Sequence, residues 1–291
     1  MSAQDFLHAS QNRIQAWLEC FLQRQNPLSA DLTAAMNHAV LNGGKRVRPT
    51  LVYGAALACG GTLKAADAAA GAVELVHCYS LVHDDLPCMD DDDLRRGVPT
   101  CHKVYGEATA LLAGDTLQTL AFVALSEGGL EPALTVRQMQ RLAVASADMA
   151  VGQGLDLAAE GQTLSLQELE SVHRHKTGAL IRASIFLGAM AAGCRDEAVL
   201  AALETYADRL GLAFQVHDDV LDVIGDTSKL GKKAGADAEH DKATYPSIMG
   251  LDAARAFATQ LHDEAVAAIE PLGCQANALR WLADFLVARD H

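Results

Sequence analysis

Residues 81–93 read LVHDDLPCMDDDD, and residues 214–223 read FQVHDDVLDV. The two segments share the tetrapeptide Val-His-Asp-Asp, at positions 82–85 and again at 216–219. In each segment the tetrapeptide follows an apolar run whose composition is typical of a helix. The repeat therefore predicts two largely buried helices that both end in carboxylates.

The first acidic end combines a helix stop with further carboxylates. Pro87 is expected to end the helix just after Asp84 and Asp85, and Asp90–Asp93 follow on the next bend. Carboxylates crowded at a buried helix end repel one another and resist desolvation, so a positive partner is required. Hard oxygen ligands at this density suit Mg²⁺, which takes one or two carboxylates together with substrate phosphates. A solvated helix terminus is the alternative for this run by itself.

The second acidic end presents its carboxylates in helical register. Asp218 and Asp222 are four residues apart and therefore lie on one helix face, with Asp219 about 100° around the axis. Because the same tetrapeptide follows an apolar helix twice, a chance solvated run is a poor explanation for both copies. We expect the two acidic ends to face each other across a cluster of Mg²⁺ and phosphate.

Composition favours an all-α fold. Half of the 291 residues are apolar (50%) but only 5% are aromatic, and alanine-rich helices can approach closely. Alternating β-branched runs bounded by turns are nearly absent, so no strand is predicted. The expected helices cover residues 6–21, 32–41, 50–59, 65–86, 105–125, 134–153, 165–173, 179–192, 196–224, 247–269 and 275–288, and Gly152-Gln153-Gly154 and Gly161 are expected to bracket a break. No linker or change of composition divides them, so we expect one domain, residues 1–291, forming a single large helical bundle.

Charge and cysteine content limit the partners and the compartment. The net charge of −14 argues against nucleic acid and anionic membranes as partners. The seven cysteines form no C-x-x-C pair, a pattern typical of reduced thiols in a cytosol. The opening MSAQDFLHAS does not resemble a signal peptide, and no uninterrupted apolar run approaches the ~20 residues of a membrane helix. We expect a cytoplasmic protein with no stable membrane insertion.

Basic side chains near the acidic ends offer compensating charge. Gly44–Pro49 reads GKRVRP just before a helix, where free N–H groups would add to the cations and form an anion site; a solvated basic turn is the alternative. Arg95 and Arg96 are either part of an ion-pair network with the neighbouring aspartates or bidentate phosphate clamps. His77 lies two helical turns before Asp84 on the same face, as a core residue or as a phosphate contact.

The least apolar stretch is residues 225–246, GDTSKLGKKAGADAEHDKATYP. It carries Lys229, Lys232, Lys233 and Lys242. A flexible cationic loop beside an acidic helix end is consistent with a lid over bound phosphate. A solvated surface loop is the alternative.

Together these residues resemble the short-chain trans-isoprenyl diphosphate synthases, most closely the bacterial members that make farnesyl diphosphate. The first aspartate-rich motif of that family, DDx4D followed by RRG, matches residues 84–90 and 95–97, and the second, DDxxD, matches residues 218–222. Further motifs match in family order: GKRxRP at 44–49, KT at 176–177, FQ at 214–215 and GxDxxxxK at 235–242. The matches extend over most of the chain.

The resemblance implies a fold and a reaction. The family fold is a single all-α bundle of the isoprenoid synthase type around a deep central cleft, usually as a homodimer. In the reaction, dimethylallyl and then geranyl diphosphate loses pyrophosphate, and isopentenyl diphosphate attacks the resulting allylic cation. Loss of a proton gives the product, expected to be (2E,6E)-farnesyl diphosphate. The family's proton acceptor is the released pyrophosphate rather than a side chain.

The resemblance also implies roles for the motif residues. Three Mg²⁺ ions, with Mn²⁺ as an alternative metal, are expected on Asp84, Asp85, Asp90, Asp218, Asp219 and Asp222, the last two acting more weakly or through water. Isopentenyl diphosphate is expected on Lys45, Arg48, His77 and Arg96. The allylic diphosphate is expected on Arg95, Lys176, Thr177, Gln215, Lys233 and Lys242. The catalytic set implied is Asp84, Asp85, Arg95, Lys176, Thr177, Gln215, Asp218 and Lys233.

A separate inference concerns product length. Tyr79 lies five residues before Asp84, about 7.5 Å along the helix. There Tyr79, with Ser80 beside it, would form the floor of the channel into which the prenyl tail grows; an ordinary core aromatic is the alternative. In the family a bulky residue at this position goes with a C15 product.

Other functions stay open on the sequence. A class I terpene cyclase or a longer-chain prenyl synthase shares the aspartate motifs, but a cyclase binds no second diphosphate and would not need the basic residues at 44–49. A metal-dependent phosphohydrolase of the HD type would explain the His-Asp pairs at 83–84 and 217–218, although each pair is extended by further carboxylates instead of histidines. A non-catalytic helical protein that kept the motifs is the last alternative, and the intact cations count against it.

Overall fold

The computed structural model describes residues 3–25, 29–159, 161–224 and 243–287. These residues form helices and one very short hairpin: α1 (Ala3–Arg24), α2 (Ala30–Leu41), α3 (Val47–Ala58), α4 (Leu63–Asp84), β1 (Leu94–Arg95), β2 (Val98–Pro99), α5 (Cys101–Tyr105), α6 (Glu107–Ser126), α7 (Pro132–Ala159), α8 (Leu166–His173), η1 (Arg174–Gly178), α9 (Ala179–Ala191), α10 (Glu197–Ile224), α13 (Tyr245–Met249), α14 (Leu251–Ala268), η2 (Glu270–Ala276) and α15 (Asn277–Val287). The prediction of an all-α fold is confirmed.

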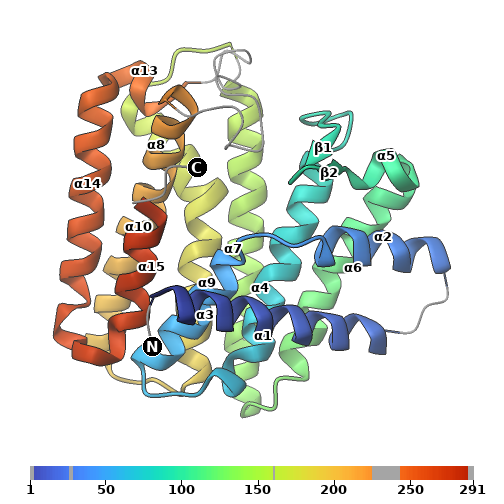
Figure 1. Cartoon of the computed structure of the whole chain (residues 1–291), viewed down its shortest axis with the longest axis horizontal. Helices are drawn as coiled ribbons and strands as arrows, with labels where there is room; N and C mark the ends of the chain where they lie inside the picture. Colours follow the sequence, from blue (N-terminus) through green and yellow to red (C-terminus); the bar gives the residue numbers. More distant parts are fainter. Residues whose placement is uncertain (1–2, 26–28, 160, 225–242, 288–291) are drawn as a thin grey trace.

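The main core is built around α3, α4 and α9. The helix α4 packs against α3, α6 and α9, and α3 packs against α9 (Figure 1). Small residues allow these close contacts: a side chain at Gly188 of α9 would meet the backbone carbonyl of Val52 on α3. Many of the buried residues are alanines, so the core helices can approach one another closely along much of their length.

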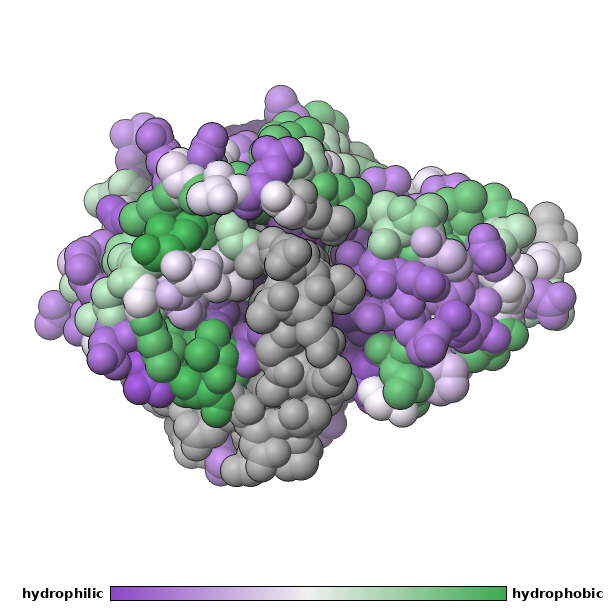
Figure 2. Space-filling view, turned by 90° about the horizontal axis from the view of Figure 1, so that it is seen from above, coloured by the Kyte–Doolittle hydropathy of each residue, from purple (hydrophilic) through white to green (hydrophobic). Residues whose placement is uncertain are grey.

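The helix that carries the second acidic segment belongs to a neighbouring cluster. It packs against α14 and α9, and its apolar face joins α8, α13 and α14 around Val216, Tyr245 and Leu261. In Figure 1 both α4 and α10 end at the upper end of the bundle, α4 beside the β1–β2 hairpin and α10 close to α13. Seen from above, the surface over the hairpin is strongly hydrophilic (Figure 2). The two acidic ends thus lie at one end of the molecule.

Most helix boundaries fall within a few residues of those predicted, but the helix predicted over 134–153 does not end at Gly152-Gln153-Gly154, and the break lies toward Gly161 in the predicted interval. The helix α7 continues through these residues to Ala159. Gly152 is buried, and a Cβ there would lie against the backbone of Lys176 in η1. This glycine serves a close helix contact and does not end a helix. The long helix predicted over 247–269 is in fact divided, at Gly250, whose φ of 88° favours glycine.

One described helix, α6, is long and apolar enough to cross a membrane by length and composition alone. Its inner face is buried against α2 and α4, as is typical of a core helix. Its outer face leaves Leu111 and Leu112 exposed.

Candidate active site

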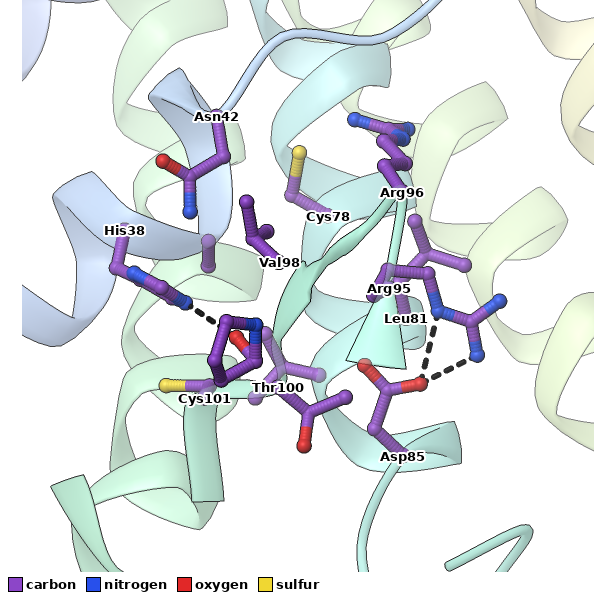
Figure 3. A pocket seen from close by; sticks show the side chains of 13 residues that line it. His38, Asn42, Cys78, Leu81, Asp85, Arg95, Arg96, Val98, Thr100 and Cys101 are labelled. Carbon is purple, nitrogen blue, oxygen red and sulfur yellow. Dashed lines mark hydrogen bonds and ion pairs between the residues drawn. The ribbon is translucent and has the colours of Figure 1, made fainter. Parts of the chain in front are cut away.

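The first acidic end gives its two leading carboxylates different surroundings. Asp84 closes α4 and lines a cavity of about 440 Å³. Burial raises the pKa of Asp84 to about 6, against the opposing effect of the Lys176 charge. Asp85 is buried at the helix end and accepts a hydrogen bond from Nε of Arg95 at 2.9 Å (Figure 3). A desolvated carboxylate such as Asp84, whose charge is only partly compensated, suits binding of a cation.

The acidic run that follows α4 divides into an inner and an outer part. The backbone N–H of Asp90 donates to the carbonyl of Asp84 at 2.9 Å, which folds the turn back onto the helix end. The charge of Asp90 also contributes to the raised pKa of Asp84. Asp91 and Asp93 instead pair with Lys103 in solvent. The alternative of a solvated helix terminus therefore holds for Asp91 and Asp93.

Arg95 and Arg96 take different partners. Arg95 pairs with Asp85 and donates to Asp92 at 2.9 Å. Burial alone would lower the pKa of the Arg95 guanidinium, but the hydrogen bond and charge of Asp85, together with the charges of Asp92 and Asp84, outweigh it and the pKa is raised. Arg96 donates to the carbonyl of Gly43 at 2.5 Å, beside the basic turn. Arg95 therefore forms the ion-pair network with neighbouring aspartates that the sequence left open. Arg96 instead lines a neighbouring cavity.

That neighbouring cavity, of about 600 Å³, is lined by all four residues predicted to bind isopentenyl diphosphate: Lys45, Arg48, His77 and Arg96. Nε of Arg48 is buried without a hydrogen-bond partner among the described residues. Burial lowers the pKa of Arg48, and burial together with the Arg48 charge holds the pKa of His77 well below its usual range. A cavity walled by cations, one of them with an unused donor, is suited to an anion.

A buried ion pair that the sequence analysis did not predict fixes the basic turn. Arg46 has a left-handed backbone (φ 50°), and its guanidinium donates to Glu74 at 2.6 Å and to the carbonyl of Val40. Arg46 and Glu74 are both almost completely buried. Because Glu74 belongs to α4, this pair ties the basic turn to the helix that carries Asp84. In the sequence, Glu74 stands in the middle of an apolar helix, and such an acidic residue indicates a buried basic partner.

The two cavities share Arg48 and His77 as a common wall. The 440 Å³ cavity is polar where Asp84 and Lys176 line it, and elsewhere its lining includes Tyr79, Met89, Met149 and Leu157. A ligand with a charged head and an apolar tail fits this lining.

The second acidic end is organised by hydrogen bonds to Asp219. This carboxylate is 3% exposed and accepts from Nε2 of Gln215 at 3.0 Å and from the backbone N–H of Tyr245 at 3.1 Å. Oε1 of Gln215 in turn accepts from the hydroxyl of Thr177 at 3.2 Å. The amide of Gln215 is thereby held with its oxygen toward Thr177, which lines the 440 Å³ cavity.

Asp218 and Asp222 complete the second motif. The charge of Asp218 opposes the lowering of the Arg48 pKa that burial causes, so this acidic end acts on the wall between the two cavities. Asp222 is buried one turn further along α10.

Lys176 and Thr177 lie in η1, a π-helical turn between α8 and α9. Nζ of Lys176 pairs with Asp156 of α7 at 2.5 Å. Such π turns are rare and are frequent at functional sites. Gln153, one turn before Asp156, lines the same cavity, and both of its side-chain polar atoms are buried without a partner in the part of the chain described. Neither Gln153 nor Asp156 is among the predicted site residues: Gln153 stands at the predicted end of its helix, and Asp156 falls in the interval predicted as a break.

The donor chemistry of the acidic ends fits Mg²⁺. Within residues 3–25, 29–159, 161–224 and 243–287, no group of three or more His, Cys, Asp and Glu side chains could hold a metal. Magnesium, however, is commonly bound by one or two carboxylates plus substrate phosphates, and the half-buried Asp84 beside the buried Asp85 supplies such ligands. Lys233 and Lys242, predicted to bind the allylic diphosphate, lie outside the described residues.

The comparisons with known proteins agree on one family. The chain matches the polyprenyl synthetase family model over residues 29–270. It is 51% identical over 264 residues to the farnesyl diphosphate synthase of Escherichia coli (strain K12), covering 88% of each chain. It is 43% identical over 288 residues to the chloroplastic geranylgeranyl pyrophosphate synthase of Catharanthus roseus, covering 96% of this chain and 79% of that one. The solved geranyltransferase of Helicobacter pylori, complexed with magnesium and isoprenyl diphosphate, matches with a TM-score of 0.83 and 34% identity, covering 97% of this chain and 96% of that one.

Proposed function

Because the chain belongs to the polyprenyl synthetase family, we propose that its two cavities bind the two diphosphate substrates of a prenyl transfer. The reaction is the Mg²⁺-dependent condensation of dimethylallyl diphosphate, and then geranyl diphosphate, with isopentenyl diphosphate, giving (2E,6E)-farnesyl diphosphate and pyrophosphate. The single observation that supports the assignment of substrates to cavities is their shared wall of Arg48 and His77. Two anionic substrates in adjoining cavities are in position to react with each other.

The allylic diphosphate is assigned to the 440 Å³ cavity. Its head would lie near Asp84 and Lys176, and its prenyl chain would extend along the apolar lining. Three Mg²⁺ ions, or Mn²⁺ in their place, would be held by Asp84, Asp85, Asp90 and Asp218, with Asp219 and Asp222 contributing through water. The chemistry that Mg²⁺ supplies when bound is compensation of the negative charge that develops on the leaving pyrophosphate.

Basic side chains of the protein would also compensate the negative charge of the leaving pyrophosphate. Asp156 orients Nζ of Lys176, and Arg95 lies at the other edge of the first acidic end. Both would bind the leaving diphosphate, and Lys233 and Lys242 would do so from the lid, which lies outside the described residues. Cations that are already oriented stabilise developing charge without reorganisation during the reaction.

The side-chain oxygens of Thr177 and Gln215 are assigned to the allylic cation. Their hydrogen bond places the two oxygens side by side, and Asp219 prevents the amide of Gln215 from turning its nitrogen toward Thr177. Dipoles whose negative ends face a developing cation lower the barrier to ionisation. We assign no side chain as the base, because the released pyrophosphate can accept the proton.

Isopentenyl diphosphate is assigned to the 600 Å³ cavity. Lys45, Arg48 and Arg96 would bind its diphosphate, and His77 would act as a neutral hydrogen-bond donor because its pKa is held low. This second anion site distinguishes a prenyl transfer from a terpene cyclisation, which uses one diphosphate. An HD-type hydrolase is not favoured, since Nε2 of His83 contacts the carbonyl of Leu111 at 3.0 Å and is not directed at the first acidic end.

We also propose that residues 1–291 act as one cytoplasmic domain that pairs with a second copy of the chain. The supporting observation is that apolar side chains are exposed on both α6 and α7, at Leu111, Leu112, Val136, Val144 and Val151. Exposed apolar side chains that gather in a patch mark a protein interface. Sedimentation equilibrium would show a dimer, and Leu112→Asp with Val144→Asp would convert it to a monomer.

The function is tested by incubating the protein with dimethylallyl and isopentenyl diphosphates and Mg²⁺ and identifying the products by mass. We expect C15 farnesyl diphosphate, formed only when a divalent metal is present. Release of phosphate without condensation would contradict the proposal and favour a hydrolase. A folded protein that produces neither would favour the non-catalytic alternative.

A further inference from the structure

A chain of hydrogen bonds lies behind the proposed floor of the allylic cavity. The hydroxyl of Tyr79 and Oγ of Ser146 are 2.9 Å apart, and Nε2 of Gln118 donates to the same Oγ at 3.1 Å. The three residues come from α4, α7 and α6 respectively. Tyr79 lines the cavity, whereas Ser146 and Gln118 do not. The cavity floor therefore depends on residues that the proposed reaction does not use.

These bonds restrict the tyrosine ring at both ends. Its Cβ is fixed by α4, and its oxygen is fixed by Ser146, whichever of the two hydroxyls donates. The ring also meets the edge of His83, with centroids 5.8 Å apart and an interplanar angle of 73°. Tyr79 and Ser146 are both buried, so water does not compete for the bond. A ring without this anchor could rotate about its side-chain torsions and open the end of the cavity.

We propose that Ser146 and Gln118 are positioning residues that set product length by holding Tyr79 across the end of the cavity. The inference rests on the proposed function, because it needs a growing prenyl tail that reaches Tyr79. A neutral hydrogen bond of this kind contributes enough free energy to change a side-chain population about fivefold. Its loss should therefore alter the ratio of products more than the rate of condensation.

The test compares variants that remove the anchor with one that removes the ring. Ser146→Ala and Tyr79→Phe each delete the bond but keep the aromatic ring. Gln118→Leu removes the donor that orients Oγ of Ser146 and so weakens the bond to Tyr79. Tyr79→Ala removes the ring itself. Ser184→Ala is the matched control, because its buried hydroxyl donates within α9, to the carbonyl of Leu180, and Ser184 is not among the residues that line the cavity. The readout is the ratio of C20 to C15 product from geranyl and isopentenyl diphosphates, together with total turnover and melting temperature.

We expect Tyr79→Ala to give mainly products longer than C15. Ser146→Ala and Tyr79→Phe should each raise the C20-to-C15 ratio about fivefold, and the double variant should not exceed either one, because both delete the same bond. Ser184→Ala should leave the ratio unchanged. If Ser146→Ala does not fold, Tyr79→Phe and Gln118→Leu still provide the comparison.

Different failures have different meanings. An unchanged ratio in Ser146→Ala and Tyr79→Phe, with longer products in Tyr79→Ala, would overturn the inference and leave the floor and the reaction intact. C15 products from Tyr79→Ala would overturn both the inference and the floor. Absence of any condensation by the unaltered protein would instead contradict the proposed function.

Discussion

Thr177 donates a hydrogen bond from its hydroxyl to Oε1 of Gln215 at 3.2 Å, which joins η1 to the helix that carries the second acidic end. Asp219 accepts from the other end of the same amide, so the orientation of Gln215 is determined by its neighbours. This arrangement connects the cavity wall with the aspartate motif. Asp219 is thus buried in hydrogen bonds, while the charge of its neighbour Asp218 acts on Arg48.

Replacement of Gln215 by leucine should lower kcat about 10- to 100-fold with geranyl diphosphate, because an oxygen dipole at the developing cation is lost. The KM for isopentenyl diphosphate should change little, since that substrate is assigned to the other cavity. Steady-state kinetics would measure both. Gln162→Leu is the control, as Gln162 is exposed and its side-chain amide donates to the carbonyl of Ala158, a residue outside both cavities. A change confined to the KM for isopentenyl diphosphate would contradict the assignment.

Gly152→Ala should disturb the position of Lys176, because the added Cβ would meet the backbone of that residue. We expect a loss of stability of about 1–3 kcal/mol, as for other overpacked sites, and a several-fold higher KM for the allylic diphosphate. Gly154→Ala is the stability control: it lies in the same helix with nothing within 4 Å, so alanine should stabilise by up to ~1 kcal/mol. Equal effects of the two substitutions on urea unfolding would show that helix propensity, and not contact with η1, determines the result.

Glu74→Ala should destabilise the protein by about 3–5 kcal/mol, since it leaves the buried guanidinium of Arg46 without its partner. The exposed pair Arg24 and Glu127, at 3.4 Å, provides the comparison. Glu127→Ala should cost less than ~1 kcal/mol, because water screens that pair. Chemical unfolding of both variants would measure the difference. Similar losses would mean that burial of the Arg46 pair is unimportant for the basic turn.

Local signals in the sequence predicted much of this fold. The apolar runs before each Val-His-Asp-Asp are helices, and the helix predicted over 165–173 is α8, which begins with a capping box of Ser165 and Glu168. The family inferred from the motifs is confirmed by the comparisons. These features depend on residues close together in the chain, which explains why the sequence is sufficient to predict them.

Long-range contacts were not predictable in the same way. The glycines around Gln153 indicated a helix end, because the contact that Gly152 serves, with Lys176, is distant in sequence. The bond of Tyr79 to Ser146 and the pair of Arg46 with Glu74 likewise depend on which helices pack together. The roles of Lys233 and Lys242 stay predictions, because both lie outside the described residues.

The central claim is that the two acidic ends act on one pyrophosphate, and a double-mutant cycle with Asp84→Ala and Asp218→Ala tests it most directly. Each substitution should lower single-turnover condensation of geranyl and isopentenyl diphosphates by about 10³-fold, with the helical circular dichroism unchanged. Asp263→Ala, at an exposed position on α14, is the control. If both aspartates stabilise the same leaving group, the double variant should be at most about tenfold slower than the worse single one. Losses that multiply fully in the double variant would show that the two ends act independently, and would contradict the account.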